Sequence, residues 1–521
     1  MNQSMRRAGI GLLAMACALS ARAGARAQEQ SPARALLEAA AEAMGGLDRL
    51  EGLENVVMTG FGQRIYQEGG GFITGERNAP PKWQAVTDAQ RTFDLVGERA
   101  LNQERRAYQF PFAAEFGMNY ARATSVQTGV GLLDHPLSAL LEALDPETAL
   151  GPVTTEEGVA VVQFVPDGGN PAWIGIDAQT HLPAFTRWIA GSNTLGDVTH
   201  TAYFTGYMPF DGVQLPMGLL NKMDWRDTIS LMFQVDSYRV DVAADQLPEF
   251  PEPAAPGGGG GGAAPAEAVV TELAPGVWDV RVGSGGPFGG SGGPIIEFDD
   301  HLVMFEAYGS EAATLARIDA ANELVPGKEV EAVIVTHHHF DHTGGLRAAV
   351  SRGLTVISHR GNEGIIREMV TRPAVNFPDA LAENPHELVF VPVDETLVLE
   401  DDTQRLEIYR VIEHAHMANA IFAYLPEERI FMEGDLSDVS WGMHWWGGAL
   451  AANVEHYGLD PETNVAVHGN GPLSFAETLA NSQTQAEAAQ AYCEASEKGG
   501  YFVFGCPVQY DTEGPLALSP R

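Results

Sequence analysis

The chain has 521 residues, too many for one hydrophobic core of ordinary size, so at least two domains are expected. Hydrophobic residues make up 45% of it, which is typical of a globular protein. Its formal net charge of −38 argues against nucleic acids and anionic membranes as partners, because both carry negative charge.

Residues 1–27 have the pattern of a secretory signal peptide. Arg6 and Arg7 precede an apolar run, Ala8 to Leu19, and Ala25-Arg26-Ala27 offers small residues at a cleavage site. The run is short for a membrane span, so cleavage is expected rather than a short membrane anchor. The sequence therefore predicts a periplasmic or secreted protein without a membrane span, and loss of the signal's four arginines changes the formal charge to −42.

The three cysteines suggest neither a lipid anchor nor a metal site. Cys17 lacks the leucine three residues earlier that lipid-attachment sites favour. Cys493 and Cys506 can form one disulfide in an oxidising compartment or remain two separate thiols. Neither has the CxxC spacing of a cysteine-based metal site.

A glycine-rich segment divides the chain. Phe250 to Ala268 reads FPEPAAPGGGGGGAAPAEA, and six consecutive glycines among prolines and alanines are typical of a flexible linker. The predicted organisation is a signal peptide (1–27), a β-rich domain (28–250), a linker (251–268), a second domain (269–480) and a C-terminal helix with a tail (481–521).

The first domain is predicted to begin with a helix and to continue as strands. Ser31 and Pro32 favour a helix start, the run ARALLEAAAEAM continues it to Met44, and Gly45-Gly46 ends it. The later runs AWIGIDAQTHLPAFTRW, YMPFDGVQLPMGLL and ISLMFQVDSYRV predict hairpins and strands of a curved antiparallel sheet. This pattern resembles the half-barrel domains of periplasmic lipoprotein-carrier proteins, which implies a binding or scaffolding role.

The second domain alternates strands and helices, which indicates a layered α/β fold. VWDVRV, PIIEFDD and HLVMFEAYG are predicted strands, ATLARIDAANELV is a predicted amphipathic helix, and VEAVIVT is a predicted buried strand. The last of these strands leads directly into THHHFDHTGG, residues 336–345, and a predicted helix, LRAAVSRG, follows. The candidate functional residues therefore follow the carboxyl end of a buried strand, where α/β folds place their functional sites.

Residues 336–345 contain four ligand-type side chains that can share metal ions. On an extended backbone His337 and His339 point the same way, and Asp341 and His342 follow after a turn. His338 is expected to face away from the ions. Imidazole and carboxylate ligands without thiolate suit zinc and tolerate iron or manganese.

Four residues far along the chain are candidates to complete the coordination. His414 and His416 precede the Leu425-Pro426 turn, and Asp435 and His468 each lie close to the end of an apolar strand. The recurrence of ligand types at strand ends favours a metal site over a polar loop.

HHHFDH contains HxHxDH, the signature of the metallo-β-lactamase superfamily, and His416, Asp435 and His468 follow in the family's order. The chain resembles this superfamily over roughly Val269 to Ala480. The resemblance implies an αββα sandwich, so the predicted fold class is α/β in the C-terminal half, preceded by a mainly antiparallel β (α+β) domain. The implied ligands are His337, His339 and His416 for a first metal, Asp341, His342 and His468 for a second metal, and Asp435 as the bridge. His416 is preferred over His414 because it lies nine residues before the leucine of the Leu-Pro turn, as in family members.

Two positions depart from the family pattern. Glu306 stands where the family often has an aspartate that supports the ligand loop. Asp435 occupies a position where some true β-lactamases carry cysteine or serine, and an aspartate there is typical of hydrolases of other substrates.

The resemblance implies an exported hydrolase with two Zn²⁺ ions, Fe or Mn remaining open, that activates water to cleave an ester, lactone, thioester or amide of a small molecule. Asp341 is the expected catalytic residue, orienting the nucleophile. The alternatives are a β-lactamase, an iron oxygenase acting on sulfur substrates, and a ligand- or lipid-binding protein with a secondary metal site. A flavodiiron-type enzyme is disfavoured because the second ligand position is His339 and not a carboxylate.

Three aromatic residues are candidates for contacting the substrate. Trp445 and Trp446 lie in SWGMHWWGG soon after Asp435, and Phe288 lies in the glycine-rich stretch from Gly283 to Gly293. Packing of the tryptophans in a core or lid is the alternative. The sequence identifies neither the substrate nor a protein partner.

Overall fold

The computed structural model describes residues 31–108, 121–166, 169–251, 267–286, 289–412, 414, 416–437, 448–469 and 471–498. The predicted signal peptide with Cys17, most of the predicted linker, and the candidate substrate-binding residues Phe288, Trp445 and Trp446 lie outside these ranges, as does Cys506. Cys493 is disulfide-bonded. None of the described helices combines the length and apolarity needed to span a bilayer.

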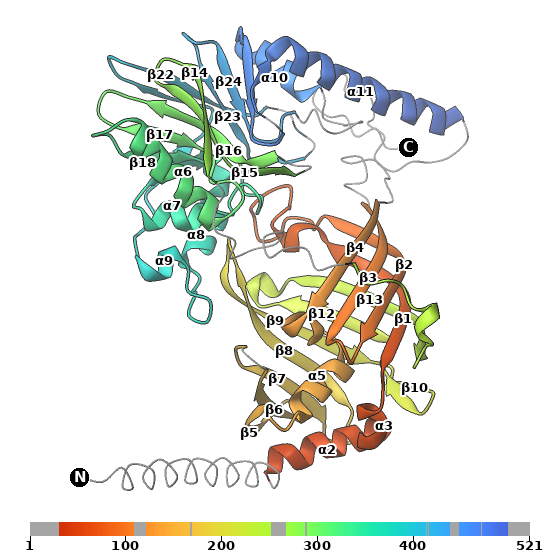
Figure 1. The fold of residues 1–521 in the computed structure, drawn as a ribbon. Coiled ribbons are helices and arrows are strands. Elements are labelled where there is room, and N and C mark those ends of the chain that lie inside the picture. The colour runs from red at the N-terminus through yellow and green to blue at the C-terminus, as the bar shows by residue number, and fades with distance from the viewer. Residues whose placement is uncertain are drawn as a thin grey trace, which may run out of the picture.

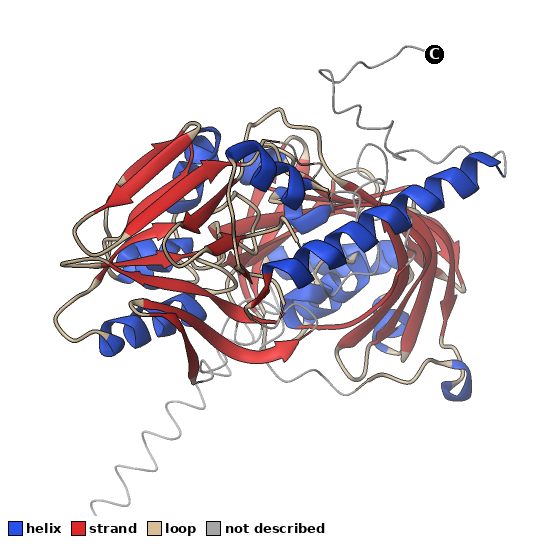
Figure 2. Cartoon of the chain, turned by 90° about the horizontal axis from the view of Figure 1, so that it is seen from above, coloured by secondary structure: helices blue, strands red, loops and turns tan. Residues whose placement is uncertain are grey.

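The N-terminal domain is a curved antiparallel sheet with helices packed on it (Figures 1 and 2). Its eleven described strands have the order β4-β3-β2-β1-β13-β12-β9-β8-β7-β6-β5. Their bounds are β1 Asn55–Ile65, β2 Trp83–Asp94, β3 Arg99–Tyr108, β4 Ala121–Thr128, β5 Ala149–Glu156, β6 Val159–Val165, β7 Ala172–Asp177, β8 Pro183–Ser192, β9 Gly196–Thr205, β12 Gly218–Met223 and β13 Ile229–Val240. Helices α2 (Pro32–Met44), α3 (Leu47–Glu51) and α5 (Pro136–Leu144) contribute apolar residues to the core that the sheet encloses.

The predicted first helix is confirmed, together with both of its ends. The side chain of Ser31 accepts a hydrogen bond from the Arg34 N–H at 3.1 Å, and Pro32 takes the first helical position. Gly45 ends the helix with φ 137°, a backbone angle that disfavours other residues.

The predicted hairpins are confirmed with one correction. Strands β7 and β8 pair as expected from AWIGIDAQTHLPAFTRW. In YMPFDGVQLPMGLL, however, β10 (Met208–Phe210) and β11 (Val213–Leu215) form a separate two-stranded sheet, and only β12 joins the large one. The local turn signal predicted this pairing, but the attachment of a short hairpin to a larger sheet depends on tertiary packing.

The C-terminal domain is a sandwich of two sheets with helices on both outer faces, as predicted (Figures 1 and 2). One sheet has the order β14-β15-β16-β17-β18-β19-β20 and the other β21-β22-β23-β24-β25-β26. The strand bounds are β14 Ala268–Ala274, β15 Val277–Gly286, β16 Gly289–Glu297, β17 Leu302–Phe305, β18 Val330–Ile334, β19 Thr355–His359, β20 Phe390–Val393, β21 Thr396–Glu400, β22 Arg405–Arg410, β23 Ile421–Leu425, β24 Ile430–Glu433, β25 Thr463–Ala466 and β26 Leu473–Ser474. The helices are α6 Glu311–Leu324, α7 Leu346–Ser351, α8 Glu363–Thr371, α9 Ala380–Glu383, α10 Ala449–Tyr457 and α11 Phe475–Lys498.

Three apolar clusters hold the layers together. One lies between the two sheets, one between α6–α8 and the seven-stranded sheet, and one between α10–α11 and the six-stranded sheet. Every residue of β17 is buried because both faces of its sheet are covered, which explains the continuous apolar run LVMF. The C-terminal helix, expected from residue 481, begins already at Phe475, whose ring packs 5.8 Å from that of Phe431.

The two domains are joined by direct polar contacts. The carboxylate of Asp197, on β9, accepts hydrogen bonds from the backbone N–H groups of Val375, Asn376 and Phe377 at 2.8–3.0 Å. Glu368 on α8 accepts from Arg226 of the N-terminal domain at 2.7 Å. The N-terminal domain is therefore packed against α8 and the loop that follows it.

Candidate metal centre

The predicted ligand loop starts where β18, an inner strand of the seven-stranded sheet, ends. Thr336 donates its backbone N–H to the Glu306 carboxylate at 3.1 Å, and its carbonyl accepts from the Ile421 N–H at 2.9 Å. The chain then turns, with the His342 N–H donating to the His339 carbonyl at 3.1 Å. The turn brings the side chains on either side of it toward the same space.

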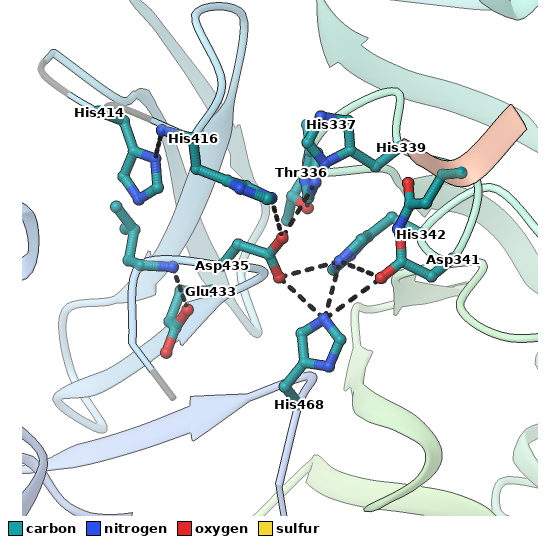
Figure 3. A network of polar contacts seen from close by, with 12 residues as sticks. Thr336, His337, His339, Asp341, His342, His414, His416, Glu433, Asp435 and His468 are labelled. Carbon is teal, nitrogen blue, oxygen red and sulfur yellow. Dashed lines mark hydrogen bonds and ion pairs between the residues drawn. The ribbon is translucent and has the colours of Figure 1, made fainter. Parts of the chain in front are cut away.

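The second sheet supplies the distant residues. His416 precedes β23, Asp435 follows β24, and His468 follows β25. Because these strands are neighbours in one sheet, their ends bring the three side chains together with the loop from the first sheet (Figure 3). Glu433 supports the turn that carries Asp435, since its carboxylate accepts the Leu436 N–H at 2.8 Å.

Asp435 lies between two groups of histidines (Figure 3). Its Oδ2 is 2.9 Å from His416 Nε2 and 3.3 Å from His337 Nε2. Its Oδ1 is 3.0 Å from the Nε2 atoms of both His342 and His468. Each carboxylate oxygen therefore faces a different set of imidazoles.

Two of the three groups of possible ion donors among the described residues together contain the predicted ligands. Within each set the ligand atoms lie within 4.8 Å of one another; the sets are His337, His339, His416 and Asp435, and Asp341, His342 and His468. Asp341 Oδ2 lies 3.6 Å from His342 Nε2 and 3.5 Å from His468 Nε2. All seven residues predicted from the sequence are thus brought together.

Neighbouring groups set the orientation of the imidazoles. Glu306 Oε1 lies 3.1 Å from His342 Nδ1, and Tyr308 Oη lies 3.2 Å from His468 Nδ1, so the Nε2 atoms of both rings turn toward Asp435. Glu306, His337 and His342 also lie close together. Glu306 already accepts the Thr336 N–H, so it supports the loop, as expected for its place in the sequence.

The geometry fits a bound cation. His339 Nδ1 is buried and makes no hydrogen bond among the described residues. His342 and His468 direct their Nε2 atoms at each other across 3.2 Å. An ion is the partner that buried ring nitrogens of this kind require, and imidazole with carboxylate suits zinc or a similar transition metal.

Charge differs between the two sets. Burial, followed by the charge of His342, lowers the pKa of His337 to about 3, and burial also holds the pKa of His339 well below its usual value. Although burial opposes it, the carboxylates of Asp435 and Asp341 raise the pKa of His468 to about 10. In the first set His337 and His339 are therefore neutral imidazoles, the form that ligates metals, whereas His468 of the second set favours positive charge.

Two other histidines lie outside these sets. His338 is buried but belongs to neither set, as predicted. His414 also belongs to neither, and its Nδ1 accepts the backbone N–H of His416 at 3.1 Å. The sequence-based preference for His416 agrees with this arrangement.

Sequence reasoning missed the residues that reach the centre from the N-terminal domain. The Nε2 of Gln67 lies 3.0 Å from Asp341 Oδ1, and the Phe72 carbonyl lies 3.0 Å from His339 Nε2. The only signal near them is the triple glycine Gly69-Gly70-Gly71, which is typical of a close backbone approach. Tyr308 was missed as well, although it lies two residues after Glu306, a position that the sequence had singled out.

Comparisons with known proteins find one family match and several similar solved structures. The family model described as "Metallo-beta-lactamase superfamily" matches residues 295–424. Among solved structures, the chain is similar to a metallo-beta-lactamase from Pontibacter korlensis (19% identity, 42% of this chain and 99% of that one, TM-score 0.32). It is also similar to one from Hirschia baltica (19%, 42% and 97%, 0.33) and to the sec-alkylsulfatase Pisa1 from Pseudomonas sp. (18%, 45% and 44%, 0.33). A search of curated proteins found no match.

The family match lies within the C-terminal domain. The resemblance of the N-terminal domain to carrier half-barrels stays a prediction. The family match covers the HxHxDH motif and the sandwich strands around it. Residues 295–424 of this chain, which hold this motif, therefore belong to the metallo-β-lactamase superfamily.

Proposed function

We propose that this protein is an exported, metal-dependent hydrolase with a two-metal centre that cleaves an ester, lactone, thioester or amide of a small molecule. Superfamily membership supports metal-dependent hydrolysis in general. The observation that carries the two-metal proposal is the position of Asp435, whose two oxygens face two separate sets of imidazoles. A carboxylate in this position can bridge two ions.

The proposed ligands follow from the two sets of donors. The first ion would be held by His337, His339 and His416, the second by Asp341, His342 and His468, with Asp435 shared. Zinc is the first choice, because the donors are nitrogen and oxygen atoms without thiolate, and iron or manganese is the alternative.

When bound, such a pair of ions supplies Lewis-acid activation of water and of the substrate carbonyl. The protein's own contribution is position and charge. Although burial opposes it, the neighbouring His342 and His468 lower the pKa of Asp341, so this carboxylate is ionised at neutral pH. Asp341 is the proposed catalytic residue, since an ionised carboxylate beside the second set can accept a hydrogen bond from the attacking water and orient it.

A panel of lactones, esters, thioesters and β-lactams, assayed with and without a chelator, tests the proposal. We expect chelator-sensitive hydrolysis of at least one carbonyl substrate, and about two equivalents of metal per chain by elemental analysis. Asp341→Asn should lower kcat at least about 100-fold while the protein stays folded. Full activity of this variant would contradict the assignment.

The same panel separates the alternative functions. Turnover of nitrocefin as the preferred substrate would favour a β-lactamase, although the aspartate at position 435 argues against it. Iron alone, in protein purified in air, would favour an oxygenase. Metal binding without any hydrolysis would favour a ligand-binding protein.

A further inference from the structure

The N-terminal domain sends one segment, residues 66–82, to the metal centre. It follows β1 and begins with the short helix η1 (Tyr66–Gly69). A reddish ribbon of the N-terminal domain is visible beside His339 in Figure 3. The contacts of this segment with proposed ligand residues are Gln67 Nε2 to Asp341 Oδ1 (3.0 Å), His339 Nε2 to the Phe72 carbonyl (3.0 Å) and Lys82 Nζ to the His416 carbonyl (2.6 Å).

The contact with His339 defines how this ring can bind a metal. A carbonyl oxygen only accepts hydrogen bonds, so Nε2 carries the proton and donates a hydrogen bond to the Phe72 carbonyl. Nδ1 is then the atom with a free lone pair, and it is the buried atom without a hydrogen bond among the described residues. The N-terminal domain thereby selects the tautomer that can act as a ligand.

The contact with Asp341 holds the more exposed of the two carboxylates among the proposed ligands. The side chain of Asp341 is 29% exposed, whereas that of Asp435 is 9% exposed. Asp341 Oδ2 faces His342 and His468, and its other oxygen accepts from the Gln67 amide. Without this bond the carboxylate can rotate away from the second set.

The backbone at Gln67 adopts an uncommon conformation. Gln67 has φ 44° and ψ 41°, and Glu68 has φ 51°, a left-handed region that residues other than glycine rarely occupy. Such conformations persist where surrounding contacts determine them, and they cluster at functional sites. Here the conformation places the Gln67 amide within reach of both Asp341 and the Tyr66 hydroxyl, which is 3.2 Å away.

Packing fixes the position of this segment relative to the ligand loop. Gly70 lies against Phe340, and a Cβ added to Gly70 would come within 2.1 Å of the aromatic ring. Phe340 stands between His339 and Asp341 in the motif and packs 5.5 Å from the Trp225 ring of the N-terminal domain. The spacing of the two segments therefore depends on the absence of a side chain at position 70.

We propose that Gln67 is a positioning residue that holds Asp341 for the second metal, so that the N-terminal domain completes the metal centre. The inference rests on the two-metal function proposed above. It assigns a role in metal binding to a domain for which the sequence implied a binding or scaffolding role.

The test measures stepwise Zn²⁺ affinities of the full chain by competition with a chromophoric chelator. Gln67→Met keeps the length of the side chain and removes the amide. We expect the second Zn²⁺ to bind about 10- to 100-fold more weakly and the first within about threefold of wild type. The matched control is Glu68→Gln, an exposed neighbour with a similar backbone, which should retain both affinities.

A second variant acts through different atoms. Gly70 has φ −69° and ψ −18°, which alanine adopts without strain, so Gly70→Ala acts through its contact with Phe340 and should also weaken the second site. In a His468→Ala background, which leaves only the first set complete, Gln67→Met should not change Zn²⁺ affinity. A change there would show general damage to the centre and would overturn a specific role for Gln67.

The outcomes separate this inference from the function on which it rests. If wild type binds fewer than two Zn²⁺ ions, the proposed function and the inference both fail. If wild type binds two ions and Gln67→Met binds both with unchanged affinity, only the inference fails. Circular dichroism of the metal-free variants shows whether they are folded.

Discussion

His342 and His468 are 126 positions apart in sequence, yet their Nε2 atoms lie 3.2 Å from each other. Each ring is held from its far side, His342 by Glu306 and His468 by Tyr308. Both inner nitrogens also face Asp435 Oδ1 at 3.0 Å. Buried imidazoles brought together around a carboxylate form a site that favours a bound cation.

Removing one of these rings should remove one ion. For His468→Ala we expect metal content to fall from about two equivalents to one, and kcat/KM to fall at least about 100-fold. Elemental analysis after gel filtration measures the first effect. A control variant, His386→Ala, removes an exposed histidine and should keep both ions. Two retained equivalents in His468→Ala would contradict the proposed ligand sets.

Glu306 should affect metal affinity without being a ligand. Its carboxylate accepts from Thr336 and faces His342 Nδ1, so Glu306→Gln keeps the shape and removes the charge that favours the ligating tautomer. We expect a loss of about tenfold in Zn²⁺ affinity, concentrated on the second ion. Chelator competition measures this loss. Complete loss of both ions would indicate instead that Glu306 binds metal directly.

Asp197 should contribute strongly to the contact between domains. Its buried carboxylate accepts three backbone N–H groups and the side-chain amide of Asn376. Asp197→Ala leaves these donors without their acceptor, so we expect the free energy of unfolding to fall by about 2–3 kcal/mol. Urea unfolding followed by tryptophan fluorescence measures the change. Asp236→Ala, an exposed aspartate on β13, should alter it by less than about 0.5 kcal/mol.

The N-terminal domain should lose stability in mild acid because of His135. Burial, followed by the charge of Arg91, holds the pKa of His135 well below its usual 6.5. A histidine with a depressed pKa binds fewer protons in the folded state than in the unfolded state. Above pH 6.5 both states are neutral at this residue, so it has no effect on stability. As the pH falls below 6.5 the unfolded state takes up the proton first, and the folded state loses stability. The expected slope from this one group is about 1.4 kcal/mol per pH unit.

The variant that tests this effect is His135→Phe. The ring lies 4.6 Å from Phe93, and Tyr238 keeps its bond to the Pro216 carbonyl at 2.8 Å, so a phenyl ring should be tolerated. Urea unfolding at pH 7 and pH 5 should show a smaller loss of stability in the variant than in wild type. An exposed-site control, His386→Gln, should follow wild type at both values.

Much of the site was predictable because its signals are local. The first four ligand residues lie within six positions after an apolar strand, and their chemical types alone indicated a metal centre. The ends of helix α2 were equally local, because Ser31 and Gly45 act on backbone groups a few residues away. Strand ends also suggested His416, Asp435 and His468, but their roles as ligands came from the resemblance to the metallo-β-lactamase superfamily.

The sequence by itself determined the donor chemistry and the order of the elements, because those depend on residue type and on hydrogen bonds between near neighbours. Only the tertiary structure decided that Asp435 faces two sets of imidazoles, that β10 and β11 form their own sheet, and that Gln67 reaches Asp341. Gln67 and Asp341 are 274 positions apart. No periodic pattern encodes a contact over that separation; it arises when the packing of two domains brings their surfaces together.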